Sequence, residues 1–255
     1  MSTNTLIIPF RHAAHIPLCL TSLEVCGDID QHQILLAQHG GPMCDFGRDD
    51  LNLCHWYVCD HEPFHLSKLL NGAVKRARTQ WVTVLQPDVL VPFDFIATLE
   101  TLQSQASGDR FYFPVRYLDS DMTESVESRF NLFYERVIPA KSEWKRGSET
   151  YGRFVVGSAC FTVRASSYIE LGGYDERFHD RSLAGIDFGM RWLNTNPPPA
   201  CVDCHLFHRW CRTGSFEENP ATEARERELF AEKQRDGFPS PSITREWGVF
   251  QRTDA

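Results

Sequence analysis

The stretch "FHLSKLLNGAVKRARTQWVTVLQPDVLVP", residues 64–92, decides the fold. Its first part has apolar residues at the spacing i, i+3, i+4, i+7, i+8 and i+11, which predicts an amphipathic helix. They are Leu66, Leu69, Leu70, Ala73, Val74 and Ala77. The second part, from Trp81, is the apolar run of a buried strand, which breaks at Pro87 because proline cannot donate a hydrogen bond to a central ladder. The stretch therefore predicts a helix, a buried strand and then a loop.

The segments on either side repeat this alternation. Strands are expected at residues 5–10, 33–41, 53–60 and 110–117, and helices at 13–25, 187–195 and 221–236. Residues 154–178 are expected to form a strand pair, or a strand and then a short helix that stops at Gly172-Gly173. Alternating strands and helices with short connections favour an α/β fold, Rossmann-like, with a mixed, mainly parallel central sheet flanked by helices. Ligands of such sheets bind beyond the carboxyl ends of the strands. Here those ends fall at residues 9–12, 38–41, 60–62 and 86–88.

The length and composition predict one main domain. The chain has 255 residues, of which 42% are hydrophobic, and this is enough for one large core. We expect a single domain over residues 1–216, with a first half at 1–118 and a second half at 119–216, followed by a helical tail at 217–255. Within the second half, residues 141–153 read as a loop or lid that carries Trp144, Lys145, Arg146, Tyr151 and Arg153.

The charge and the cysteines restrict the class of protein. The net charge of −8 argues against a protein whose whole surface binds nucleic acid. Nine cysteines at irregular spacing, and an amino terminus without a signal-peptide pattern, predict a reduced, cytoplasmic protein. We expect no transmembrane segment, because no apolar run approaches bilayer length.

The stretch "CVDCHLFHRWCR", residues 201–212, raises the question of a zinc site. Its cysteines and histidines are spaced more tightly than usual zinc ligands, and no second distant pair accompanies them. If residues 201–208 form a strand, Cys201 and Cys204 point to opposite faces. We therefore favour packing roles for the cysteines. His208 then has two interpretations, a satisfied core histidine or a metal ligand.

Three segments occur in an order that is typical of one enzyme family. They are "TLIIPFRH" at residues 5–12, "LLNGAVKRARTQWVTVLQPDVLVP" at 69–92, and "VGSACFTVRASSYIELGGYDERFHDRSLAGIDFGMRW" at 156–192. Together they resemble the opening strand, the Asp-x-Asp region and the acceptor-side segment of the GT-A glycosyltransferases of family 2. The resemblance extends over the chain up to Glu217.

The resemblance implies an enzyme that moves a sugar from a nucleoside diphosphate sugar, first of all a UDP-sugar, to an acceptor hydroxyl with inversion. It also implies Mn²⁺ or Mg²⁺, because a cation neutralises the departing diphosphate. The Asp-x-Asp motif falls on Gln86-Pro87-Asp88, and a late metal-binding histidine of related enzymes, including the polypeptide N-acetylgalactosaminyltransferases, falls on His208, with His205 as the second choice. The implied metal ligands are therefore Asp88 and His208. Other implied nucleotide-sugar contacts are Pro9, Arg11, Gln38, Asn71 and Gln86.

The sequence departs from the family pattern at its acids. Gln86 carries no charge, which lowers the expected metal affinity. The Glu-Asp pair that supplies the general base falls on Ala184 and Gly185, and neither can take a proton. We therefore expect the base to be Asp187 or Asp180, or to be absent. Ordinary structural uses, a turn for Asp88 and a helix cap for Asp187, stay open.

Two functions of different classes follow. The first is a metal-dependent glycosyltransferase whose acceptor is a glycan, a lipid, a protein or a modified nucleobase. The second is a weak or inactive GT-A module that binds a nucleotide or glycan or acts as an assembly partner.

Overall fold

The computed structural model describes residues 4–47, 51–58, 64–104, 108–137, 160–179, 181–210 and 220–250. Its strands are β1 (Asn4–Phe10), β2 (Gln33–His39), β3 (Leu53–Val58), β4 (Trp81–Val84), β5 (Val89–Leu90), β6 (Arg110–Tyr112), β7 (Val115–Tyr117), β8 (Phe161–Arg164), β9 (Ala200–Cys201) and β10 (Leu206–His208). Its helices are α1 (Ile16–Glu24), α2 (Leu66–Arg76), α3 (Phe95–Ser104), α4 (Ser120–Ser128), α5 (Ala165–Glu170), α6 (Arg181–Leu193) and α7 (Pro220–Arg235). Short helical turns cover Ala13–His15, Ile29–Gln31 and Phe133–Val137.

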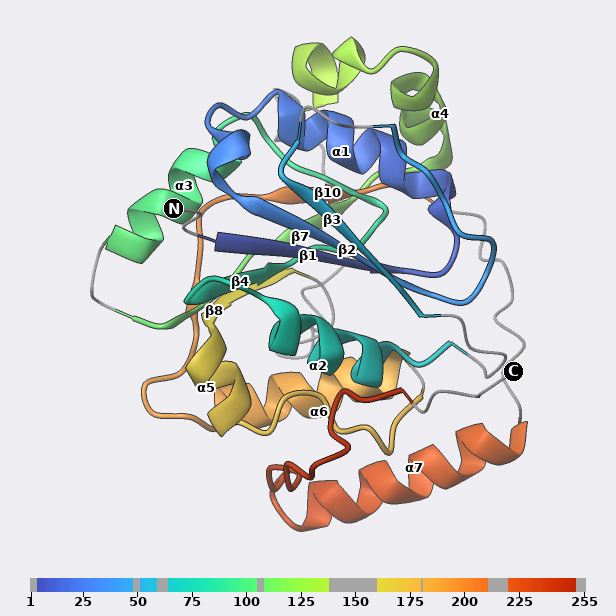
Figure 1. Ribbon diagram of the computed structural model, residues 1–255, viewed down its shortest axis with the longest axis vertical. Coiled ribbons are helices and arrows are strands. Elements are labelled where there is room, and N and C mark those ends of the chain that lie inside the picture. The colour runs from blue at the N-terminus through green and yellow to red at the C-terminus, as the bar shows by residue number, and fades with distance from the viewer. Residues whose placement is uncertain are drawn as a thin grey trace.

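The expected mixed, mainly parallel sheet is confirmed. Seven strands lie in the order β3-β2-β1-β4-β8-β6-β9, and β8 is antiparallel to both of its neighbours while the other pairs are parallel. Helices cover both faces of this sheet, with α1 and α3 on one side and α2, α5 and α6 on the other (Figure 1). A second sheet has the order β5-β10-β7.

Three stretches of chain are each divided between the two sheets. The break expected at Pro87 separates β4 from β5, the strand expected at 110–117 becomes β6 and β7, and the strand considered at 201–208 becomes β9 and β10. Pro87 and Pro114 lie at two of these breaks, where a residue without an N–H interrupts the ladder. The second sheet therefore forms from chain that leaves the first sheet at its β4, β6 and β9 strands.

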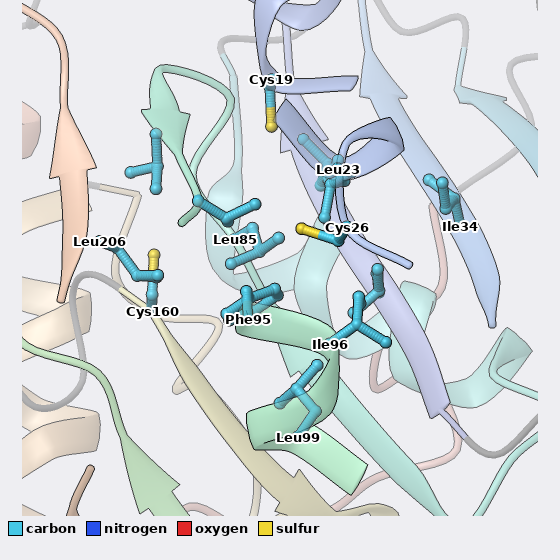
Figure 2. Close-up of a cluster of buried hydrophobic side chains, with 14 of the residues drawn as sticks. Cys19, Leu23, Cys26, Ile34, Leu85, Phe95, Ile96, Leu99, Cys160 and Leu206 are labelled. Carbon is cyan, nitrogen blue, oxygen red and sulfur yellow. The ribbon is translucent and has the colours of Figure 1, made fainter. Parts of the chain in front are cut away.

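One half of the core lies on the α1 face of the sheet. Alternate residues of β1 and β2, such as Leu6, Ile8 and Ile34, pack there against α1 and α3. Figure 2 shows that the side chains of Cys19, Cys26 and Cys160 belong to this cluster. Burial is the largest cause that raises the pKa of Cys19 and Cys26 to about 12, so these thiols stay protonated and act as small apolar groups.

The other half of the core ties the carboxyl-terminal segment to the domain. Ile7, Leu35 and Val82 face α2 and α6, and Trp247 is buried in the same cluster. The indole Nε1 of Trp247 donates to the carbonyl of Gly172 at 3.1 Å. Helix α7, which the sequence predicts, lies outside α6 (Figure 1). The segment after Pro220 therefore shares one core with the helices before it.

One expectation about local structure is wrong. Helix α6 begins at Arg181 rather than near Asp187, so Asp187 lies inside the helix and is not its cap. The polar stretch after Asp119 contains helix α4, whose amino end is capped by the Asp119 carboxylate, which accepts from the amide of Met122 at 2.8 Å. The expected lid at residues 141–153 lies outside the described residues.

The turn at Gly173 tests this packing. A Cβ there would lie 2.4 Å from Trp247 Cζ2 and 2.5 Å from Asn71 Oδ1, and the φ angle is +61°. We expect Gly173→Ala to lower the free energy of unfolding by about 2–5 kcal/mol through overpacking and backbone strain. Gly27→Ala is the matched control, because no atom lies within 4 Å of its Cβ position. Urea unfolding measures both variants; equal midpoints would contradict the packing around Gly173.

Candidate functional site

Asp88 and His208 lie side by side at the junction of the two sheets. Antiparallel pairing of β10 with β5 sets His208 opposite Val89, and the amide of Arg209 donates to the Asp88 carbonyl at 2.9 Å. The two side chains meet at 3.2 Å between His208 Nε2 and Asp88 Oδ2. Both side chains are mostly buried. The structure thus brings together the two residues that the sequence analysis selects as metal ligands.

The orientation of the His208 ring suits a ligand role. Its Nδ1 lies 2.6 Å from the carbonyl of Arg209, which can only accept a hydrogen bond, so Nδ1 is the donor there. Nε2 is therefore the ring nitrogen that faces Asp88 and that a cation would bind. One carboxylate and one imidazole oriented by a backbone carbonyl form a donor set that Mn²⁺ accepts, with water and phosphate oxygens as the remaining ligands. In the described part of the chain no third histidine, cysteine or acid joins them.

A buried arginine lies next to this pair. The Arg209 side chain is 1% exposed; its Nη1 lies 3.1 Å from Glu127 Oε1 and its Nη2 donates to the His15 carbonyl at 2.9 Å. Burial, and then the Arg209 charge, lower the pKa of His15. Arg209 therefore adds positive charge beside Asp88 and connects the end of β10 to α4 and to the helical turn before α1. No sequence pattern points to His15 or Glu127, because only the tertiary fold brings them to this site.

The predicted nucleotide contacts lie at the carboxyl ends of the strands. Pro9 is opposite Ala37 in the β1–β2 register, and Gln38 is the next residue of β2. Gln38 is fully buried: its Nε2 donates to the carbonyls of Gly40 and Pro42, and its Oε1 lies 3.0 Å from His55 Nε2. Gln38 therefore fixes the loop after β2. Both polar atoms of its carboxamide already have partners within the chain.

Arg11 and Gln86 are more accessible than Gln38. Arg11 is partly exposed just beyond β1, and its carbonyl lies near Gly41 of the loop after β2. Gln86 is partly exposed in the turn before β5, and its carbonyl accepts from the amide of Val89 at 3.2 Å. Both residues lie at the edge of the sheet where Asp88 is found.

Asn71 is placed away from solvent. Its Nδ2 donates to the Tyr174 carbonyl and Glu176 Oε1, and its Oδ1 accepts from the Tyr168 hydroxyl and the Tyr174 amide. These four hydrogen bonds use the whole capacity of a carboxamide. We therefore assign Asn71 to the connection between α2 and the Gly172-Gly173 turn rather than to the donor.

Asp187 is also enclosed. Its side chain is 0% exposed, with Oδ2 2.8 Å from Arg191 Nη2 and Oδ1 2.7 Å from Lys233 Nζ of α7. Lys233 also binds Asp175, whose burial would raise its pKa but whose hydrogen bonds from Arg177 and Lys233 hold that pKa below its usual value. A carboxylate between two buried cations cannot reach an acceptor hydroxyl, so Asp187 anchors α7. Asp180 lies outside the described residues.

The cysteines near residue 201 do not form a metal cluster in the described residues. Cys204 is buried in the α1-face core, where burial is the largest cause that raises its pKa to about 12. Cys201 is exposed at the end of β9. His205 Nε2 lies 3.8 Å from Asp203. Cys211 lies outside the described residues.

The sheet order, with one antiparallel strand at β8 and an acid at the turn after β4, defines the class: the chain has the GT-A fold of nucleotide-sugar glycosyltransferases. Among solved structures it is similar to residues 1–349 of S. aureus TarS in complex with UDP-GlcNAc, with a TM-score of 0.63 and 12% identity over 91% of this chain and 66% of that one. No protein-family model and no curated sequence matches it.

Two further structures have the same fold. The mannosyltransferase PcManGT from Pyrobaculum calidifontis, in complex with GDP-Man and Mn²⁺, matches with a TM-score of 0.57 and 16% identity over 93% of this chain and 65% of that one. GalNAc-T7 with UDP, GalNAc and Mn²⁺ matches with a TM-score of 0.58 and 12% identity over 95% and 52%. The chain thus spans less than two thirds of these proteins' lengths. Among the described residues, no helix is long and apolar enough to cross a bilayer.

The assignment of Asp187 to an anchoring role predicts a large loss of stability. Asp187→Asn leaves Lys233 and Arg191 with one fewer buried counter-charge, and we expect the free energy of unfolding to fall by about 3–5 kcal/mol. Glu223→Gln is the control: it removes the exposed ion pair with Arg227 and should cost less than about 1 kcal/mol. Chemical denaturation measures both. An Asp187→Asn variant as stable as the control would return Asp187 to the list of candidate bases.

A second prediction concerns pH. His65, 6% exposed, lies 3.1 Å from the Glu176 carbonyl through Nε2, while burial and then the nearby His179 and Lys68 lower its pKa to about 3. Between pH 6.5 and 3 the unfolded state binds a proton here and the folded state does not, so stability falls as pH decreases through this window. We expect His65→Asn to reduce that slope, with the exposed His12→Asn as control. Unfolding curves from pH 7 to 4 measure it; unchanged slopes would contradict the burial of a neutral His65.

Proposed function

We propose that this protein is a glycosyltransferase that moves a sugar from a nucleoside diphosphate sugar to an acceptor hydroxyl. The preferred donor in this proposal is a UDP-sugar. The observation that carries the proposal is the Asp88–His208 pair, at the carboxyl edge of the sheet in a GT-A fold. TarS, PcManGT and GalNAc-T7 were solved with UDP-GlcNAc, with GDP-Man and Mn²⁺, and with UDP and Mn²⁺ respectively, which supports a nucleotide ligand for the same fold here.

Asp88 and His208 would hold Mn²⁺ or Mg²⁺. The cation, when bound, neutralises the negative charge that develops on the departing diphosphate. The chain contributes the orientation of its own ligands: the Arg209 carbonyl fixes the ring of His208, and the strand pairing of β5 with β10 fixes the distance to Asp88. Arg209 supplies a permanent positive charge in the same region. Arg11 and Gln86, which remain partly exposed, are the proposed contacts to the nucleotide.

The general base stays a separate proposal. Inversion by direct displacement needs one group to accept the proton of the acceptor hydroxyl. With Asp187 assigned to the α7 anchor, Asp180 is our remaining candidate from the sequence. It precedes Arg181, the first residue of α6, by one position.

A second function is favoured by particular residues. The resemblance expects acids at three positions that carry Gln86, Ala184 and Gly185. Ala184 is fully buried in the half of the core that contains α2 and α6. A protein that keeps the Asp88–His208 pair without a base would bind a metal–nucleotide complex and not turn it over. Binding and turnover must therefore be measured separately.

Calorimetric titration with UDP and GDP, with and without Mn²⁺, tests the site. We expect Mn²⁺ to tighten nucleotide binding at least tenfold, and Asp88→Ala and His208→Ala to abolish that gain, because each removes one of two protein ligands. Asp203→Ala is the control, since its carboxylate is fully exposed and contacts only His205 among the described residues. Metal-dependent binding that survives in Asp88→Ala would refute the site.

Release of UDP or GDP from their sugar conjugates in the presence of a mixed acceptor pool then separates the two functions. Turnover that disappears in Asp88→Ala supports the enzyme. Tight, metal-dependent binding without turnover on any donor supports the inactive module.

A further inference from the structure

Two exposed aromatic residues belong to the strand ends that carry His208: Tyr117 packs on its ring, and Trp210 follows it in the chain. Tyr117 is the last residue of β7 and pairs with His208 in the parallel β7–β10 register. Their ring centroids are 4.8 Å apart with an interplanar angle of 38°, yet Tyr117 is still 55% exposed. Trp210, two residues after His208, is 46% exposed. We call Tyr117 and Trp210 the aromatic shelf.

The backbone beneath the aromatic shelf is held by buried partners. The amide of Leu118 donates to the His208 carbonyl at 2.8 Å, so the chain next to Tyr117 is fixed to β10. The amide of Trp210 donates to Thr123 Oγ1 at 2.8 Å, and Thr123 is buried in α4. Two large rings are thus presented to solvent from rigid elements. Aromatic side chains of this kind give contact area at a small cost in conformational entropy.

The charges around the aromatic shelf select against anionic partners. Helix α4, whose Thr123 accepts from the Trp210 amide, carries four exposed acids: Asp119 at its cap, Asp121, Glu124 and Glu127. Only Glu127 among these pairs with a buried cation, Arg209. Carboxylates accept hydrogen bonds from hydroxyl groups and repel phosphate and sulfate. A nucleic acid or an anionic lipid surface is therefore disfavoured here.

A sugar ring fits this combination. The C–H face of a pyranose carries partial positive charge that matches the negative face of an aromatic ring, and its hydroxyl groups are donors for carboxylates. Two separate rings among acids also differ from the continuous apolar patch that a lipid chain requires. The position beside Asp88 and His208 is where an acceptor hydroxyl must come if these residues hold the donor.

We propose that the aromatic shelf binds a sugar ring of a neutral glycan, which is the acceptor. This inference rests on the proposed function, because it assigns the acceptor of the same site. It replaces the open choice among glycan, lipid, protein and nucleobase by one class, and it makes Tyr117 and Trp210 acceptor-binding residues.

The test is a glycan array of neutral, sialylated and sulfated oligosaccharides, probed with the full chain in the presence of Mn²⁺ and UDP, followed by titration of the best neutral glycan. We expect neutral glycans to bind best, and Tyr117→Ala and Trp210→Ala each to weaken binding about tenfold or more, since each removes an aromatic face on which a ring can stack. Tyr117→Phe should retain binding because the ring is kept. Phe93→Ala, which removes another exposed aromatic outside the shelf, should have no effect.

Nucleotide binding provides the second readout. We expect the affinity for UDP with Mn²⁺ to stay within about twofold in both shelf variants, because neither side chain is a proposed donor contact. If Tyr117→Ala weakens UDP and glycan equally, Tyr117 only orients His208 and the inference is overturned. Preferential binding of sulfated glycans, or of phosphatidylglycerol vesicles or single-stranded RNA tested in parallel, would also overturn it. Loss of metal-dependent UDP binding in the unaltered chain would instead overturn the proposed function.

Discussion

The pairing of β10 between β5 and β7 is the constraint on which the candidate site depends. These strands are short. Each one follows directly after a strand of the large sheet: β5 after β4, β7 after β6 and β10 after β9. The register sets His208 against Val89 on one side and Tyr117 on the other. Since side chains alternate along a strand, a slip of one residue would turn His208 away from Asp88 and expose Phe207, which now packs on α4. The hydrophobic contacts of Phe207 therefore keep the polar pair aligned.

A second group of interactions, on the opposite face, holds the segment from Tyr168 to Asp187 and uses its polar groups for packing. Asn71 satisfies the backbone of the turn at Gly173 and Tyr174, and Lys233 connects Asp175 to Asp187. These groups are buried and paired, so they provide conformational specificity rather than chemistry. In this segment the positions of the family's Glu-Asp pair carry Ala184 and Gly185. Two of the acids that remain, Asp175 and Asp187, form buried ion pairs with Lys233.

The sequence was sufficient for the features that depend on local pattern. The periodicity of α2, the buried run of β4 and the alternation of strands with helices predicted the layered α/β fold, and the order of three segments pointed to the GT-A class. The resemblance also selected Asp88 and His208, which the structure places side by side. The sequence was insufficient where long-range contacts decide. The division of three strands between two sheets depends on which neighbours are available, and the enclosure of Asn71 and Asp187 depends on Tyr174 and Lys233, residues distant in the chain. Helix α4 has too few apolar residues for a periodic signal.

The distribution of thiols has a practical consequence for spectroscopy. The buried thiols of Cys19, Cys26 and Cys160 are protonated and screened, whereas Cys54 and Cys201 are exposed. Cys54 lies in β3 and Cys201 in β9, the two outermost strands of the seven-stranded sheet. Six strand spacings separate them, which is roughly 30 Å. Maleimide dyes at these two positions would span the full width of the sheet and give a resonance-energy-transfer ruler across it.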